Sequence, residues 1–350
     1  MEIKTKWAEL LVKGGAAEKG KGILRKAALG GNSDAALALK EILEEEDAQE
    51  EVVELLRGCA QSGGAGVILS LADLLSEMPG SEAEAEKWYK KAVAEGLSGS
   101  LNNYGCFLLD QHRPEEAEVV LRSAIDEGDE LARGNLGKHY FDLEEYRESL
   151  TYLAQSVENG NSRVTSYLAR THIELGNLEE ADRWTSAALE QENAGAYLAR
   201  ALFLARFAGE AEKRDSIERA FKAAIEESPE AHFYYANWLS SVGRRVEAVE
   251  EYDKSIDAGE TNSHLNVAIV LDDLGMKEKA EQHLRAGISA GDPESAASLA
   301  RFLADENRLN EVPPVIREAE RLGCSSAEVA ELWVMYQDNM QSGDDVDGAV

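Results

Sequence analysis

The sequence has little proline and few aromatic residues. Only six of its 350 residues are proline, and 7% are aromatic. Strands need runs of β-branched and aromatic residues with alternating polarity, and the sequence has no such runs. Alanine is abundant instead, and proline, which breaks helices, is rare. These absences exclude a β-sheet fold and favour an all-α chain.

Cysteine and catalytic motifs are equally scarce. Cys59, Cys106 and Cys324 lie far apart and form no CxxC pair, which excludes a disulfide framework and a zinc site. The six histidines form no HExxH or other metal-ligand pair, and there is no GxSxG, Walker-type or dinucleotide-binding motif. We therefore expect no catalytic residues, no bound metal, no cofactor and no enzymatic activity.

Long apolar runs are missing as well. No stretch approaches the roughly 18 consecutive apolar residues that a membrane span requires. The N-terminal apolar run, Trp7 to Val12, is interrupted by Glu9 and is too short for a secretory signal. We expect a protein that does not enter the membrane and is cytoplasmic, which agrees with the sparse, unpaired cysteines.

Positive charge is in short supply. The chain has 36 Lys and Arg against 67 Asp and Glu, for a net charge of −31. Residues 1–30 carry seven basic against three acidic residues, so they contribute about +4 and the rest about −35. A chain this acidic repels phosphate backbones, so we expect no direct binding of nucleic acid and an attraction to basic partners. A well-solvated outer helix surface explains the same charge without a partner.

Small residues are what the sequence has at regular spacing. Five of the seven intervals in one set of eight are 32 residues, the other two being 36 and 31. Its members are Ala92, Ala124, Ser156, Ala188, Ala224, Ser255, Gly287 and Ala319. A second set runs parallel to it: Ala72, Gly105, Gly137, Ala169, Ala199, Ala236, Ala268 and Ala300. This period predicts stacked copies of one unit, in which small residues let two helices approach closely.

Nine units follow from the period, each predicted to be helix, turn, helix and a glycine-containing turn. They begin near residues 33, 65, 98, 130, 162, 192, 229, 261 and 293. The unit 261–291 has Ala268, Leu271, Gly275, Ala280, Leu284 and Gly287 at its small and apolar positions. With this pattern the chain resembles the tetratricopeptide (TPR) family and the related Sel1-like repeats. The resemblance implies a right-handed α-solenoid, a superhelix of about nine to ten helix-turn-helix repeats.

The ends of the chain differ from the repeats. We expect residues 1–340 to form the array, with residues 1–32 as an N-terminal partial repeat or cap. Residues 326–340 form an amphipathic pattern that predicts a C-terminal capping helix. The Gly- and Asp-rich segment 341–350 is predicted to be a disordered acidic tail.

The TPR resemblance also implies where a partner binds, because in that family the first helix of each repeat lines an inner groove. Carried over by position, one register of this groove holds Asn103, Asn135, Tyr167, Tyr197, Tyr234 and Asn266. The register three residues later holds Cys106, Lys138, Arg170, Arg200, Asn237, Ile269 and Arg301. Asn can clamp a peptide backbone, Tyr supplies rigid contact area, and the cations can pair with acidic side chains or a terminal carboxylate.

A simpler explanation of the cations remains open. Lys138 precedes Asp142, Arg170 precedes Glu174 and Arg301 precedes Asp305, each by four residues. Such pairs are ordinary on helix surfaces and contribute only about 0.2–0.5 kcal/mol each.

Two functions from different classes fit the sequence. The first is a non-enzymatic scaffold or adaptor that binds another protein or a peptide along the inner groove. The second is an acidic inhibitor, like an immunity protein or antitoxin, that neutralises a basic partner such as a nuclease toxin, and its warrant is the net charge. A peptide-sensing regulator is a third possibility, and the sequence names neither the partner nor the oligomeric state.

Overall fold

The computed structural model describes residues 16–207 and 214–347, with side chains through residue 340. Within these ranges the chain consists of helices and turns and has no strand, so the all-α prediction is confirmed. The chain divides into two compact units, Met1–Val164 (unit 1) and Thr165–Val350 (unit 2), and each is described by itself.

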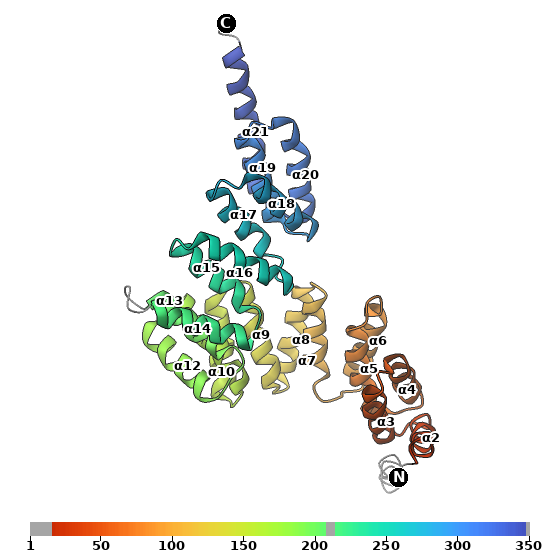
Figure 1. The fold of residues 1–350 in the computed structure, drawn as a ribbon. Coiled ribbons are helices and arrows are strands. Elements are labelled where there is room, and N and C mark those ends of the chain that lie inside the picture. The colour runs from red at the N-terminus through yellow and green to blue at the C-terminus, as the bar shows by residue number, and fades with distance from the viewer. Residues whose placement is uncertain (1–15, 208–213, 348–350) are drawn as a thin grey trace. The chain divides into compact units, whose positions relative to one another are not determined.

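Unit 1 contains nine described α-helices that follow one another as antiparallel pairs (Figure 1). They are α2 (Ala17–Ala28), α3 (Ser33–Glu45), α4 (Gln49–Gln61), α5 (Ile68–Ser76), α6 (Glu82–Ala94), α7 (Ser100–Asp110), α8 (Pro114–Asp126), α9 (Glu130–Asp142) and α10 (Tyr146–Glu158). Short 3₁₀ turns, η1 (Ala65–Val67) and η2 (Ser162–Val164), precede α5 and end the unit.

Unit 2 contains eleven described α-helices with the same alternation. They are α11 (Thr165–Glu174), α12 (Leu178–Glu190), α13 (Ala196–Phe207), α14 (Arg214–Glu227), α15 (Ala231–Ser241), α16 (Arg245–Asp257), α17 (Ser263–Asp273), α18 (Lys277–Ser289), α19 (Pro293–Asp305), α20 (Val312–Leu322) and α21 (Ser326–Asp347). A 3₁₀ turn, η4 (Leu309–Glu311), precedes α20.

The predicted repeat is confirmed unit by unit. The pairs from α3–α4 to α19–α20 make nine helical hairpins in the described chain, and every predicted unit start falls within a few residues of the first helix. The turns follow from local chemistry. Before α19, for example, Gly291 has a φ of 91°, Asp292 accepts hydrogen bonds from the backbone N–H groups of Glu294 and Ser295, and Pro293 opens the helix.

The small residues lie where the helices come closest. All sixteen members of the two sets are buried. A Cβ atom added at Gly105 would come within 2.6 Å of Leu121, on the second helix of the same hairpin. At Gly287 it would collide with Ser295, on the next hairpin. The second set, which includes Gly105, therefore determines the distance between the two helices of a hairpin. The first set, which includes Gly287, determines the distance between neighbouring hairpins.

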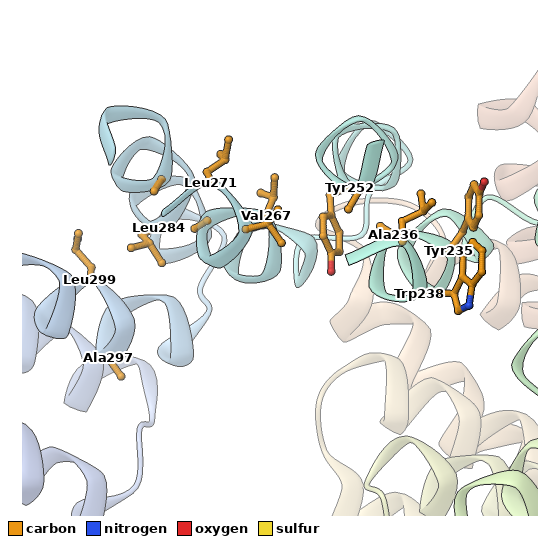
Figure 2. Close-up of a cluster of buried hydrophobic side chains, with 14 of the residues drawn as sticks. Tyr235, Ala236, Trp238, Tyr252, Val267, Leu271, Leu284, Ala297 and Leu299 are labelled. Carbon is orange, nitrogen blue, oxygen red and sulfur yellow. The ribbon is translucent and has the colours of Figure 1, made fainter. Parts of the chain in front are cut away.

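Large apolar side chains fill the remaining space. In unit 2 one continuous core runs from Leu198 to Leu332. Figure 2 shows part of it, in which Ala236 of α15, Tyr252 of α16 and Val267 of α17 follow one another. The core thus passes from each hairpin to the next, as a stack of repeats requires.

The ends depart from the predictions. The capping helix expected over 326–340 is present as α21, but it continues to Asp347, into the tail predicted to be disordered. The tail has no proline, and extending an existing helix costs little compared with nucleating one. Residues 1–15 of the predicted N-terminal cap and residues 348–350 lie outside the described residues, and α2 forms the rest of the cap. A single array over residues 1–340 stays a prediction.

The close helix contact gives a first prediction. Ala236 is fully buried, and Ala236→Leu should overpack its hairpin and lower the free energy of unfolding by about 1–3 kcal/mol. Ala327→Leu, at an exposed position of α21, is the matched control and should change it by less than about 0.5 kcal/mol. Urea unfolding followed by circular dichroism measures both. Equal effects would contradict the packing role.

A histidine pair between α17 and α18 makes stability depend on pH. Nδ1 of His264 and Nδ1 of His283 lie 3.2 Å apart, and burial lowers the pKa of both rings. The folded state therefore binds fewer protons than the unfolded chain. Its stability is complete above the ordinary histidine pKa of about 6.5 and is lost as the pH falls through the folded pKa values.

We accordingly expect the Tm to decrease between about pH 7.5 and about pH 5.5, where unfolded carboxyl groups are still ionised. His283→Gln should make this decrease smaller, because one of the two suppressed protonations is removed. His112→Asn, at an exposed turn position, should leave the dependence unchanged. Scanning calorimetry at a series of pH values measures the slope, and an identical slope in wild type and His283→Gln would refute this origin.

Candidate functional site

The first helices of the hairpins form one surface of each unit, which we call its A face. In unit 1 the A face includes α5, α7 and α9, and in unit 2 it includes α11, α13, α15, α17 and α19. Every predicted site residue lies on one of these helices: Asn103 on α7; Asn135 and Lys138 on α9; Tyr167 and Arg170 on α11; Tyr197 and Arg200 on α13; Tyr234 and Asn237 on α15; Asn266 on α17; and Arg301 on α19.

On unit 1 the A-face amides are hydrogen-bonded to one another. Asn103 Nδ2 donates to Asp73 Oδ1 at 3.4 Å, and Asn102 Nδ2 donates to Asn103 Oδ1 at 3.3 Å. Asn135 Nδ2 donates to Asn102 Oδ1 at 2.9 Å and to Cys106 Sγ at 3.1 Å. These hydrogen bonds link α5, α7 and α9, and we call the chain of amides the asparagine ladder.

The ladder follows one rule in both units. Asn103, Asn135 and Asn266 each donate to a side chain on the preceding A helix, 29 or 30 residues earlier in the chain. The acceptors are Asp73, Cys106 and Asn237. These acceptors occupy the register three residues after that of the donors. In these three hydrogen bonds the first register supplies the donor, and the register three residues later, on the preceding A helix, supplies the acceptor.

Arg170 is the centre of a buried cluster on unit 2. Its side chain is 5% exposed, and Nη2 donates to Tyr234 OH at 2.6 Å and to Glu230 Oε1 at 3.2 Å. The guanidinium carbon lies 5.2 Å from the ring centroids of both Tyr167 and Tyr234. Arg170 therefore joins α11 to α15, two hairpins further along the chain. Pairing of Arg170 with a ligand stays a prediction, and a ligand there would compete with Glu230 and the two flanking rings.

The other cations of the predicted stripe are also engaged. Arg200 pairs with Asp182 at 3.4 Å and lies 5.5 Å from the ring of Phe203. Arg301 pairs with Glu328 at 2.7 Å. Lys138 is half-buried on α9. For Arg170 and Arg301 the carboxylate partners are on other helices, so the expected pairs with Glu174 and Asp305 are not the ones the structure forms.

A hollow of about 270 Å³, which we call the aromatic hollow, opens on the A face between α11, α13 and α15. It is lined by Ile173, Glu174, Leu202, Ala205, Arg206, Phe221, Tyr234, Asn237, Trp238 and Ser241. Trp238 stacks on Tyr235 at 5.9 Å and contacts Phe221, and Figure 2 shows Tyr235 and Trp238 next to each other. Arg170 holds the hydroxyl of Tyr234, so it positions one wall of the hollow.

A second hollow, of about 190 Å³, lies between α17 and α19 and is called the acidic hollow here. Its lining is Ala268, Ile269, Asp272, Ala280, Leu284, Ser298, Arg301, Phe302 and Asp305. Between the two hollows Asn266 Nδ2 donates to Asn237 Oδ1 at 3.2 Å, and Tyr252 OH donates to the same oxygen at 2.6 Å. Both volumes are below the range of about 300–1,000 Å³ typical of small-molecule pockets. They suit single side chains.

Of the predicted site residues, Tyr234 and Asn237 line the aromatic hollow and Arg301 lines the acidic hollow. Tyr197, which is 49% exposed, lines neither. Sequence reasoning did not include Trp238 and Phe221 in the site, although both line the aromatic hollow. Both side chains are buried. The available signal was an indole directly after Asn237 in the inner register.

No activated nucleophile or metal centre emerges from the described part of the chain. Burial raises the pKa of the Cys106 and Cys324 thiols to about 11 and raises that of Cys59, so all three stay protonated. Among the described residues no three His, Cys, Asp or Glu side chains are grouped to hold a metal ion. None of the described helices combines the length and apolarity needed to cross a membrane.

The Arg170 cluster gives a prediction for stability. Arg170→Ala should lower the free energy of unfolding by about 2–4 kcal/mol, because a buried side chain, its hydrogen bonds and its contacts with two rings are lost together. Arg200→Ala, at the same register on the next A helix but much more exposed, should cost less than about 1 kcal/mol. Urea unfolding compares the two variants. A similar loss in both would mean that the cluster does not hold α11 and α15 together.

Comparison with known proteins first gives two negative results. No family model matches the chain. No curated protein matches it by sequence.

Solved structures do resemble it. Yeast Tom70 superposes with a TM-score of 0.60 at 15% identity, covering 97% of this chain and 89% of Tom70. The human IFIT1 dimer with PPP-AAAA gives 0.58 at 16% identity, covering 95% of this chain and 88% of that one. Both are TPR-repeat proteins. Together with the nine helical hairpins, these likenesses show that the chain has the TPR-like helical-repeat fold.

Proposed function

We propose that this chain is a non-enzymatic scaffold or adaptor that binds an extended segment of another protein on the A face of unit 2. The TPR-like fold supports a general repeat-based binding role. The observation that carries the proposal is the pair of side-chain-sized hollows on one run of A helices, with the hydrogen-bonded Asn237 and Asn266 between them.

The spacing of the hollows suits an extended peptide. They are centred two A helices apart, roughly 20 Å if neighbouring helices lie about 10 Å apart. An extended chain rises about 3.4 Å per residue, so about six residues would connect two side chains seated in the hollows.

The chemistry of the aromatic hollow supports the same ligand. Leu202, Ala205 and Tyr234 offer an apolar surface to one large apolar side chain, above the buried rings of Phe221 and Trp238. Asn237 uses its carbonyl oxygen for Tyr252 and Asn266, and its amide group makes no hydrogen bond to another described residue. That amide can donate to a peptide carbonyl beside the hollow.

Nucleic acid does not fit this surface. The net charge is −31, and Arg170, Arg200 and Arg301 on the A face of unit 2 are each paired with a carboxylate. Phosphate binding needs accessible cations, so we propose no direct nucleic-acid partner, in contrast to the IFIT1 dimer with PPP-AAAA. The alternative of an acidic inhibitor for a basic partner rests on net charge and not on a particular surface. We place the protein in the cytoplasm because its three cysteines are unpaired thiols.

A random 12-residue peptide library displayed on phage tests the proposal. Peptides selected on the wild-type protein should bind Ile269→Asn at least about tenfold more weakly, because Ile269 lines the acidic hollow, is 54% exposed and would lose its apolar contact with the peptide. Val246→Asn is the matched control, since Val246 is 63% exposed on α16, a second helix, and its variant should bind as wild type does. Fluorescence anisotropy with the synthetic peptides gives the affinities.

The two variants carry the same change of polarity, so a nonspecific effect of a more polar surface would weaken binding to both. Binding that is insensitive to Ile269→Asn, or equally sensitive to both changes, would place the peptide elsewhere and overturn the A-face proposal.

A further inference from the structure

We propose that the acidic hollow receives a lysine or arginine side chain of the bound peptide. This inference rests on the proposed function and assigns the chemistry of one of its subsites. The hollow combines an apolar floor with two carboxylates at its rim, which is the arrangement that a long cationic side chain requires.

The floor of the hollow is apolar. Ala280 and Leu284 of α18 lie beneath it, and Ile269 and Phe302 line it from α17 and α19. Its volume of about 190 Å³ is too small for a folded ligand and suits one extended side chain. The methylene groups of lysine or arginine can pack along such a surface, and the ring of Phe302 can face the cation.

The rim carries the negative charge. Asp272 on α17 and Asp305 on α19 line the hollow, and neither carboxylate forms an ion pair or hydrogen bond with another described residue. Both charges act on Lys277, whose pKa is raised first by its hydrogen bond to Glu306 and further by Asp272 and Asp305. The two aspartates therefore present an uncompensated field that a ligand cation can neutralise.

The cations nearby are taken up by other carboxylates. Arg301 pairs with Glu328, and Lys277 pairs with Glu306. Around the hollow there are therefore two cations and four carboxylates, those of Glu328, Glu306, Asp272 and Asp305. The local charge is about −2. The sequence analysis predicted that Arg301 would pair with an acidic side chain or a terminal carboxylate of the ligand. The inference here gives the ligand the opposite charge at this position.

The test uses the peptides selected on wild-type protein. Asp272→Asn/Asp305→Asn should bind them about tenfold more weakly, while Glu250→Gln/Asp257→Asn should change binding less than about twofold. The control pair removes the same two negative charges from exposed positions of α16. Each peptide is also synthesised with its Lys and Arg replaced by Gln. This replacement should weaken binding to wild type and have no further effect on the Asp272→Asn/Asp305→Asn variant.

The outcomes separate this inference from the proposed function. If Ile269→Asn abolishes binding but Asp272→Asn/Asp305→Asn binds as wild type does, the peptide occupies the A face and the cation assignment is wrong. If none of the three positions affects binding, both proposals fail. A synthetic peptide of residues 1–15, which contains three lysines, tests the chain's own N-terminus. Tighter binding of this peptide than of every selected one, abolished by Asp272→Asn/Asp305→Asn, would overturn the assignment to another protein.

Discussion

The distance between neighbouring helices controls the rest of this structure. At Gly137 an added Cβ would lie 2.7 Å from Leu153 Cδ2 and 3.1 Å from the Leu153 backbone nitrogen, so the two helices leave no room for a side chain there. A side chain could be accommodated only by moving the second helix of the hairpin. Because each hairpin packs on the next through the first set of small residues, which includes Gly287, such a movement would be passed along the stack. The same contacts hold the first helices side by side, which creates the A face.

This constraint explains why the fold could be predicted from the sequence. A contact that admits only Gly, Ala or Ser in every repeat appears as a period, and the period located nine hairpins and their turns without reference to any structure. The helix ends were predictable where a local signal marks them, as at Gly291, Asp292 and Pro293. The end of α21 was not, because an exposed helix beyond the packed repeats has no partner whose spacing constrains it.

The site was predictable only in part, for a related reason. Repeat register places Asn103, Asn135 and Asn266 on the first helices of their hairpins, and the structure agrees. Register does not say which atoms meet: Arg170 binds Tyr234 and Glu230, 64 and 60 residues away, and not Glu174 four residues away. The partners of long polar side chains depend on distances between atoms on different helices. The repeat period in the sequence does not contain these distances. The hollows were not predicted because their positions depend on how completely side chains of neighbouring helices fill the space between them, which the repeat period does not specify.

The A faces of the two units resolve the same chemical problem differently. Half-buried amides need hydrogen-bond partners, and on unit 1 they find them in each other through Asp73, Asn102 and Cys106. A peptide binding there would have to replace bonds that already exist, with little net gain. On unit 2 Arg170 and Arg301 are neutralised by Glu230 and Glu328, but the amide group of Asn237 and the carboxylates of Asp272 and Asp305 form no hydrogen bond or ion pair with another described residue. The same helical repeat therefore carries two faces that differ in hydrogen bonding, and the difference lies in a handful of side chains.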